Sequence, residues 1–173
     1  LLESASAEGV SAFTYTSTTS VFGDALRPPT ASPAIWVTED IVPVPRNIYG
    51  TTKSSAEDLC HLYHRKNGLN CIILRTSRFF PEEDDDKAKR EAFDGDNLKA
   101  NAFLYRRVDI QDIVDAQLLS TEKASSLGFG KFIISATTPF RREDLVRRRT
   151  DAPGLLRERF PSYEQIYQAR GWK

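Results

Sequence analysis

The sequence predicts an α/β fold built on a doubly wound parallel sheet, with part of a smaller C-terminal region beside it. Helical and strand-like segments alternate along the first half of the chain, which is the rhythm of βαβ units. The run Leu69–Thr76 is almost continuously apolar. Such a run is typical of a strand in a parallel sheet that is covered on both faces.

The first predicted elements are a short helix, a strand and a long loop. Residues 1–9 form a small apolar helical face and end at Gly9, a residue favoured at helix C-termini. Residues 11–17 are rich in β-branched and aromatic side chains and predict a strand. Residues 24–46 contain five prolines. They predict a surface loop of a length that is usually functional.

A helix is predicted over residues 48–66, followed by a strand over 69–76. An apolar stripe at i, i+3, i+4 and i+7 identifies the helix, and its members are Ala56, Leu59, Cys60 and Tyr63. Gly68 ends it. The five consecutive carboxylates Glu82–Asp86 open a charged stretch that runs to about residue 100. We interpret this stretch as a solvated loop, because contiguous carboxylates lack the ligand spacing of a calcium loop.

The remaining elements are a helix, a short strand and a charged helical region. The helix begins near residue 109 and has Ile110, Ile113, Val114, Gln117 and Leu118 on one, mainly apolar, face. Asp109, Asp112 and Asp115 gather at its start, where the helix dipole favours anions. A strand is expected over residues 131–135. Helices interrupted at Pro153 and Pro161 are expected after residue 138.

Composition excludes several classes of function. Basic and acidic residues number 24 each, so no net field directs the chain to nucleic acid or to a membrane surface. Its apolar runs are too short to span a bilayer. Cys60 and Cys71 lack metal-ligand spacing and predict reduced, packed thiols in a cytoplasmic protein. The chain has no methionine, and we interpret it as a fragment, with a processed protein as the alternative.

Tyr49 and Lys53 form the strongest candidate for a catalytic pair. Their spacing of four residues places both side chains on one face of the predicted helix. A free tyrosine is a poor base at neutral pH, and a neighbouring ammonium favours its ionised form. Such a tyrosine can exchange a proton with a hydroxyl or a carbonyl oxygen. The alternative is an ordinary surface pair, since this spacing is common in helices.

Hydroxyl side chains at the end of the preceding strand support the catalytic interpretation. Thr16–Ser20 is a run of five threonines and serines. Residues at the carboxyl end of a parallel strand face the ligand crevice of a doubly wound sheet. One of these hydroxyls is therefore expected to contact the reacting oxygen. Ordinary turn chemistry at the strand end is the alternative.

Four segments resemble, in order, the motifs of extended short-chain dehydrogenase/reductases, the NAD-dependent epimerase/dehydratase family. Phe13–Gly23 resembles the SSxxVYG segment, and Tyr49–Lys53 resembles YxxxK. Leu74–Phe79 resembles LRxxNxxGP, and Val108–Val114 resembles VDVRDVA. The resemblance implies a partial Rossmann-like sheet in residues 1–80 and 106–136. It assigns residues 81–105 and 137–173 to a substrate-binding region.

The resemblance also implies roles for individual residues. Tyr49 would be the acid/base, Lys53 would also bind the nicotinamide ribose, and Thr18 would be the third catalytic residue and contact substrate. The cofactor, NAD or NADP, would be contacted by Thr16, Thr18, Tyr49, Lys53 and Ser77. The substrate would be contacted by Thr18, Tyr49 and Arg78. The substrate would be a small molecule, a sugar nucleotide or another polar or anionic metabolite. The family is compatible with a homodimer of the full-length protein.

The sequence departs from the family pattern at three places. Phe22 replaces the usual tyrosine, and Arg78 replaces an asparagine that contacts substrate, so we expect Arg78 to bind an anionic or polar substrate group. A pairing of Arg78 with Glu82–Asp86 is the alternative. No GxxGxxG segment is present, so this chain alone should bind dinucleotide poorly and be inactive. The competing function is a pseudoenzyme or truncated module that only binds a partner.

Two further clusters receive a structural interpretation. His61 and His64 lie three residues apart, but without a third ligand a helix face is favoured over a metal site. Arg147–Arg149 could meet a phosphate, although a solvated surface is the more common role of such a run.

Overall fold

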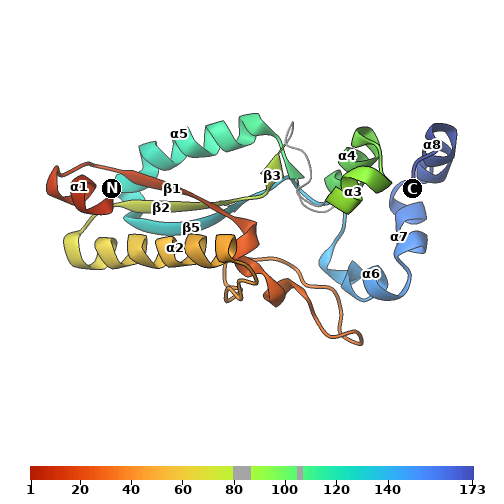
Figure 1. The fold of residues 1–173 in the computed structure, drawn as a ribbon, viewed down its shortest axis with the longest axis horizontal. Coiled ribbons are helices and arrows are strands. Elements are labelled where there is room, and N and C mark those ends of the chain that lie inside the picture. Colours follow the sequence, from red (N-terminus) through yellow and green to blue (C-terminus); the bar gives the residue numbers. More distant parts are fainter. Residues whose placement is uncertain (80–86, 105–106) are drawn as a thin grey trace. The chain divides into compact units, whose positions relative to one another are not determined.

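The computed structural model describes residues 1–79, 87–104 and 107–173, and Figure 1 shows its ribbon. The chain forms two compact units. The first contains residues 1–27, 37–77 and 108–135, and the second contains residues 28–36, 78–107 and 136–173.

The first unit is built on a three-stranded parallel sheet in the order β1-β2-β5. Its strands are β1 (Phe13–Thr18), β2 (Cys71–Thr76) and β5 (Phe129–Ile134). The register places Thr18 opposite Thr76, and Thr76 opposite Ile134. The carboxyl ends of all three strands therefore meet at one edge of the sheet. The predicted α/β class is confirmed.

Two long helices cover the two faces of this sheet (Figure 1). On the face of α2 (Ile48–Asn67), Cys60, Cys71 and Ile73 form a buried apolar cluster. On the face of α5 (Ile110–Leu127), Ile72 and Leu74 pack with Ala124. All six residues of β2 are buried, so the prediction of a central strand covered on both sides is confirmed. The short helix α1 (Leu2–Ala7) adds Leu2 and Ala5 to the α2 cluster.

Local sequence signals set the ends of these helices. Asn47 caps α2 by accepting the N–H of Gly50 at 2.8 Å, as side-chain oxygens do at helix N-termini. Gly68 ends α2 in the left-handed conformation, with φ +70°. Asp109 caps α5 through the N–H of Gln111 at 2.8 Å. The predicted bounds of α2 are correct to within one residue, whereas β5 begins two residues before its predicted start.

The apolar stripes predicted for α2 and α5 are partly wrong. Leu59 is 50% exposed, and Glu57 occupies a fully buried position of α2 instead, because Arg75 beneath it requires a carboxylate. In α5, Leu118 is 60% exposed, while the buried positions include the small residues Ser120 and Ala124.

The segment after β1 contains two short 3-10 helices and a main-chain bridge. These helices are Thr19–Phe22 and Asp24–Leu26, and Gly23 between them pairs with Val44 in an isolated parallel bridge. The loop predicted from its prolines is therefore anchored at its far end, just before α2 begins.

The second unit is mainly helical. Its helices are α3 (Lys87–Ala92), α4 (Gly95–Phe103), α6 (Arg147–Thr150), α7 (Ala152–Arg159) and α8 (Tyr163–Arg170). The short strands β3 (Arg78–Phe79) and β4 (Arg107–Val108) pair with each other. The prediction of a loop up to residue 100 is wrong for α3 and α4, where Asp94 caps α4 through the N–H of Asn97. The acidic run Glu82–Asp86 lies outside the described residues.

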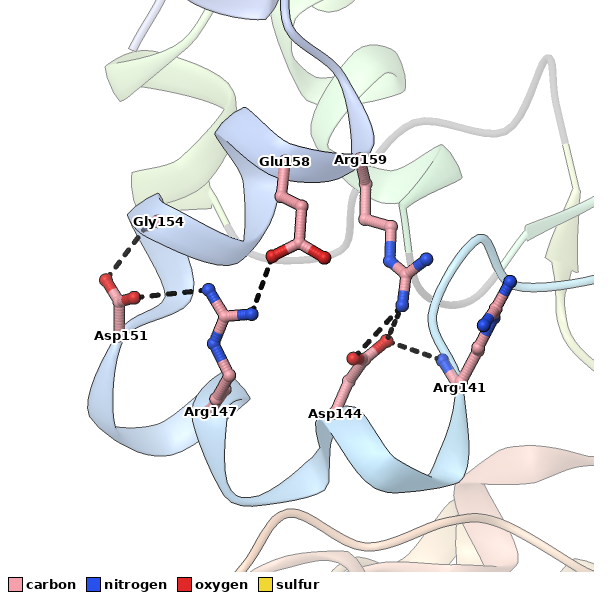
Figure 2. Close-up of polar contacts among 7 residues, drawn as sticks. All are labelled: Arg141, Asp144, Arg147, Asp151, Gly154, Glu158 and Arg159. Carbon is pink, nitrogen blue, oxygen red and sulfur yellow. Dashed lines mark hydrogen bonds and ion pairs between the residues drawn. The ribbon is translucent and has the colours of Figure 1, made fainter.

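The three arginines at 147–149 have separate partners within the second unit. Arg147 Nη1 donates to Glu158 Oε2 at 2.7 Å; Figure 2 shows this pair. The guanidinium of Arg148 lies 4.8 Å from the ring centroid of Phe140, and Arg149 donates to two main-chain carbonyl oxygens. The three side chains thus do not converge on one anion, in agreement with a structural role.

A buried carboxylate organises the start of the same helical region (Figure 2). Asp144 accepts the main-chain N–H of Arg141 at 2.8 Å and a fork of bonds from Arg159 at 3.0 and 3.2 Å. The hydrogen bond from Arg141, together with the charge of Arg159, lowers the pKa of Asp144.

Pro153 lies in the first turn of α7 and Pro161 separates α7 from α8, as expected. Among the described helices, none is both long and apolar enough to cross a membrane.

Candidate active site

Tyr49 and Lys53 lie in the first two turns of α2, beside the carboxyl end of β1. Lys53 Nζ donates to the carbonyl oxygen of Thr16 at 2.9 Å. The same ammonium lies 5.1 Å from the ring centroid of Tyr15 and 5.8 Å from that of Tyr49, within the range of a cation–π interaction. Tyr49 is 53% exposed. The ammonium is therefore held next to a phenol that is open to a ligand.

The candidate hydroxyls of β1 lie at the same edge of the sheet. Thr18 is the last residue of the strand, and its Oγ1 accepts the N–H of Ser20 at 3.1 Å. This bond caps the 3-10 helix that follows. Thr16 Oγ1 accepts Gln117 Nε2 of α5 at 2.6 Å. Thr16 thus contacts both helices, one through its carbonyl oxygen and one through its hydroxyl.

Ser77 and Arg78 fall in different units of the structure. Ser77 follows β2 at the carboxyl edge, is buried, and donates its main-chain N–H to the carbonyl oxygen of Ile134 at 2.8 Å. Arg78 lies in β3 and belongs to the second unit. The structure therefore gathers Thr16, Tyr49 and Lys53 in the first unit, whereas the role of Arg78 stays a prediction.

Gly50 brings the helix that carries Tyr49 close to the segment after β1. A Cβ on Gly50 would lie 2.9 Å from the carbonyl oxygen of Ser20 and 3.2 Å from Asn47 Oδ1. Both distances are shorter than ordinary van der Waals contact. The absence of a side chain at this position thus permits the approach of α2 to the strand end that carries Thr18.

A buried ionic network that the sequence did not predict lies on the same helix as Tyr49 and Lys53, with Glu57 of α2 at its centre. Glu57 accepts Nη2 of Arg75 at 2.7 Å and Nε of Arg75 at 3.0 Å. It also accepts Ser17 Oγ at 2.6 Å and lies 3.3 Å from Lys131 Nζ. The guanidinium of Arg75 stacks 4.9 Å from the ring centroid of Phe22. An arginine within an apolar strand was the available signal, because a buried charge requires a partner.

The network keeps Glu57 ionised. Burial alone would raise the pKa of this carboxyl group. The hydrogen bonds from Arg75 and Ser17, with the charges of Arg75 and Lys131, more than offset burial and lower its pKa.

The two histidines and two cysteines considered in the sequence make packing contacts and main-chain hydrogen bonds. His64 Nδ1 lies 3.0 Å from the carbonyl oxygen of Leu69, and both His61 and His64 stack on the ring of Phe129. Burial raises the pKa of Cys60 to about 12 and also raises that of Cys71. Both thiols are free and buried. Within the described ranges, no group of three or more potential metal ligands is found.

A separate cavity of about 650 Å³ lies within the second unit, between α4, α7 and α8. Its lining is mostly apolar and includes Phe160, Tyr163 and Trp172. None of the residues predicted to act in catalysis or cofactor binding lines it.

Comparisons with known proteins identify the family and agree with the fold. A family model described as the NAD dependent epimerase/dehydratase family matches residues 1–95. A search of curated proteins finds no match. Among solved structures, UDP-N-acetylglucosamine 4-epimerase from Bacillus cereus is 20% identical with a TM-score of 0.60, over 85% of this chain and 52% of that chain.

Two further solved structures contain dinucleotides. UDP-glucuronic acid 4-epimerase from Bacillus cereus, in complex with NAD, is 25% identical with a TM-score of 0.58, over 79% of this chain and 45% of that chain. RMD from Pseudomonas aeruginosa, complexed with NADPH, is 22% identical with a TM-score of 0.55, over 78% of this chain and 49% of that chain. The chain thus spans about half the length of the solved structures it matches.

Proposed function

Because the chain belongs to the NAD dependent epimerase/dehydratase family, we propose that the full-length protein is an NAD(P)-dependent epimerase, dehydratase or reductase. It acts on a carbon that bears a hydroxyl or carbonyl group, by hydride transfer. The observation that carries this proposal is the Tyr49–Lys53 pair, with Lys53 bonded to the Thr16 carbonyl at the carboxyl edge of the sheet. Ligands of open α/β sheets bind at that edge.

Each residue of the pair has a distinct task. The phenol of Tyr49 exchanges a proton with the reacting oxygen, because removing a hydride from an alcohol also releases its hydroxyl proton. The Lys53 ammonium, which lies 5.8 Å from the ring centroid of Tyr49, binds the nicotinamide ribose and so places the cofactor beside this phenol. The hydroxyl of Thr18 lies at the end of β1 and donates to Ser20 Oγ at 3.2 Å. Rotation of this hydroxyl turns its donor to the same reacting oxygen. Tyr49 and Thr18 thereby also contact the substrate.

The residues present fit a dinucleotide cofactor at this edge. A lysine ammonium has three donors, and Lys53 makes one hydrogen bond among the described residues, so further donors can reach ribose hydroxyls. Thr16 and Ser77 complete the proposed cofactor contacts. The bound nicotinamide supplies the hydride acceptor or donor. We place this activity in the full-length protein and propose that the chain alone is inactive.

The proposed substrate is a sugar nucleotide or another polar or anionic metabolite. A structural neighbour that is 27% identical is described in complex with UDP-glucuronic acid and NAD. Arg78 follows β2 directly. Its planar guanidinium is suited to a carboxylate or phosphate. We assign residues 81–105 and 137–173 to substrate binding.

A direct assay tests the proposal. The full-length protein is titrated with NAD and NADP, then incubated with UDP-glucuronic acid, UDP-galactose and UDP-N-acetylglucosamine, and the sugars are analysed by NMR. We expect one dinucleotide to bind at about micromolar Kd or tighter, near −8 kcal/mol, and at least one sugar to be converted. Failure of both dinucleotides to bind would contradict the proposal.

Replacing Arg78 with lysine should lower kcat/KM by the equivalent of about 1–3 kcal/mol, the scale of a lost charge-assisted hydrogen bond. Lysine retains the charge but loses the planar fork of donors. The measurement is steady-state kinetics with the converted sugar nucleotide, accompanied by thermal unfolding. An unchanged kcat/KM with a lower Tm would show that Arg78 stabilises the fold and does not bind substrate.

A further inference from the structure

Glu57 is a buried charge on the face of α2 that carries the proposed catalytic pair. It lies four residues after Lys53 and eight after Tyr49. Side chains four residues apart are neighbours along one face of a helix. Its neighbour Asp58 is exposed, so only one of these two adjacent carboxylates is buried.

Two consecutive residues of β1 are bonded to two successive turns of α2. The Thr16 carbonyl oxygen accepts Lys53 Nζ at 2.9 Å, and Ser17 Oγ donates to Glu57 Oε1 at 2.6 Å. Thr18 is the next residue of the strand. The contact at Glu57 therefore fixes where the turn that carries Lys53 stands relative to the strand end that carries Thr18.

The partners of Glu57 come from all three strands of the sheet. Ser17 lies in β1, Arg75 in β2 and Lys131 in β5. Apolar contacts between a helix and a sheet are non-directional, so by themselves they permit small rotations and shifts. A two-point arginine–carboxylate contact adds a defined geometry. One carboxylate thus fixes both the rotation and the register of α2 on the sheet.

We infer that Glu57 is a positioning residue, which holds Tyr49 and Lys53 in register with Thr18 through its bonds to Ser17 and Arg75. This inference rests on the proposed function, because it assigns the pair its proton-transfer role. Glu57 itself is covered by the sheet and does not contact the reacting atoms. Misplacement of a catalytic group by about 1 Å costs on the order of 100-fold in rate.

The first test compares Glu57→Gln with Asp58→Asn in the full-length protein. Both changes remove one negative charge from α2, but only Glu57 is bonded to the sheet. For Glu57→Gln we expect kcat to fall by about 10- to 100-fold with little change in KM. Amide exchange at Gly50–Lys53 should become at least about tenfold faster, with no change at Cys60–Lys66. Asp58→Asn should alter neither quantity.

The second test separates positioning from stability. The variant Ser17→Ala, Glu57→Met, Arg75→Met replaces the buried members of the network by apolar groups, a change that often leaves stability unaltered or raised, and leaves the partly exposed Lys131 in place. We expect its Tm to approach that of the wild type while kcat stays low and exchange at Gly50–Lys53 stays fast. Either of two results would overturn the inference. One is a kcat that recovers together with Tm in the triple variant. The other is amide exchange that becomes faster along the whole of α2 in both Glu57→Gln and the triple variant.

These outcomes are distinct from a failure of the proposed function. If the wild-type protein converts no sugar nucleotide, or if Tyr49 is dispensable for turnover, the catalytic proposal fails. Exchange at Gly50–Lys53 needs no substrate. Unchanged exchange there in Glu57→Gln would overturn the positioning role whatever the activity assay shows.

Discussion

Replacing Tyr49 with phenylalanine should lower kcat of the full-length enzyme by about two to four orders of magnitude, the range for a positioned acid/base. Phenylalanine keeps the ring that lies 5.8 Å from Lys53 Nζ, so the cation–π contact and the helix are preserved. Only the hydroxyl that we propose transfers the proton is lost. The Kd of the dinucleotide should change little, and steady-state kinetics with a titration of the cofactor measures both quantities.

Tyr63→Phe is a matched control for this change. Tyr63 lies on the same helix but packs against the buried cluster of Cys60 and Cys71. Its hydroxyl should therefore be neutral for kcat. Equal losses in both variants would point to a general disturbance of α2. Near wild-type turnover of Tyr49→Phe would remove Tyr49 from the mechanism.

The sequence was sufficient to predict the sheet because each of its signals is local. A continuous apolar run identified the central strand, and Asn47 and Gly68 stand at the observed ends of α2. The spacing of Tyr49 and Lys53 follows from helical periodicity alone. These features depend on residues close in the chain, so they could be predicted without knowledge of tertiary contacts.

Features that depend on contacts distant in the chain could not be predicted in the same way. Glu57 and Arg75 are 18 positions apart and come together only when α2 packs on β2. Leu59 matches the apolar period as well as Cys60 does, yet it is half exposed. Periodicity finds a face of a helix, whereas the residues that the sheet covers depend on how the helix is rotated.

The helices α3 and α4 were missed for a related reason. Their sequence is rich in charge and lacks an apolar stripe, so hydrophobic periodicity gives no helical signal there. Asp94 is the available local signal, because it caps α4 through the N–H of Asn97. A cap without an amphipathic pattern is weak support for a helix, since aspartate is also frequent in turns.

The largest expected loss of stability outside the ionic network comes from Gly23→Ala. Gly23 has φ +48° and ψ −119°, a conformation that residues with a Cβ rarely adopt. A Cβ at this position would also overlap the carbonyl oxygen of Val44 and approach the N of Arg46 at 2.9 Å. Both neighbours are main-chain atoms, so they cannot move aside as a flexible side chain would.

Gly23→Ala should therefore lower the free energy of unfolding by about 2–5 kcal/mol, the sum of backbone strain and overpacking. Gly68→Ala is the matched control, since Gly68 has φ +70° but no atom within 4 Å of its Cβ position. It should lose only about 1 kcal/mol. Urea unfolding of the two full-length variants measures the difference. Equal losses would show that the close approach of the Val44 carbonyl oxygen adds nothing to the cost of the substitution. They would also show that the Gly23–Val44 bridge does not anchor the chain that enters α2.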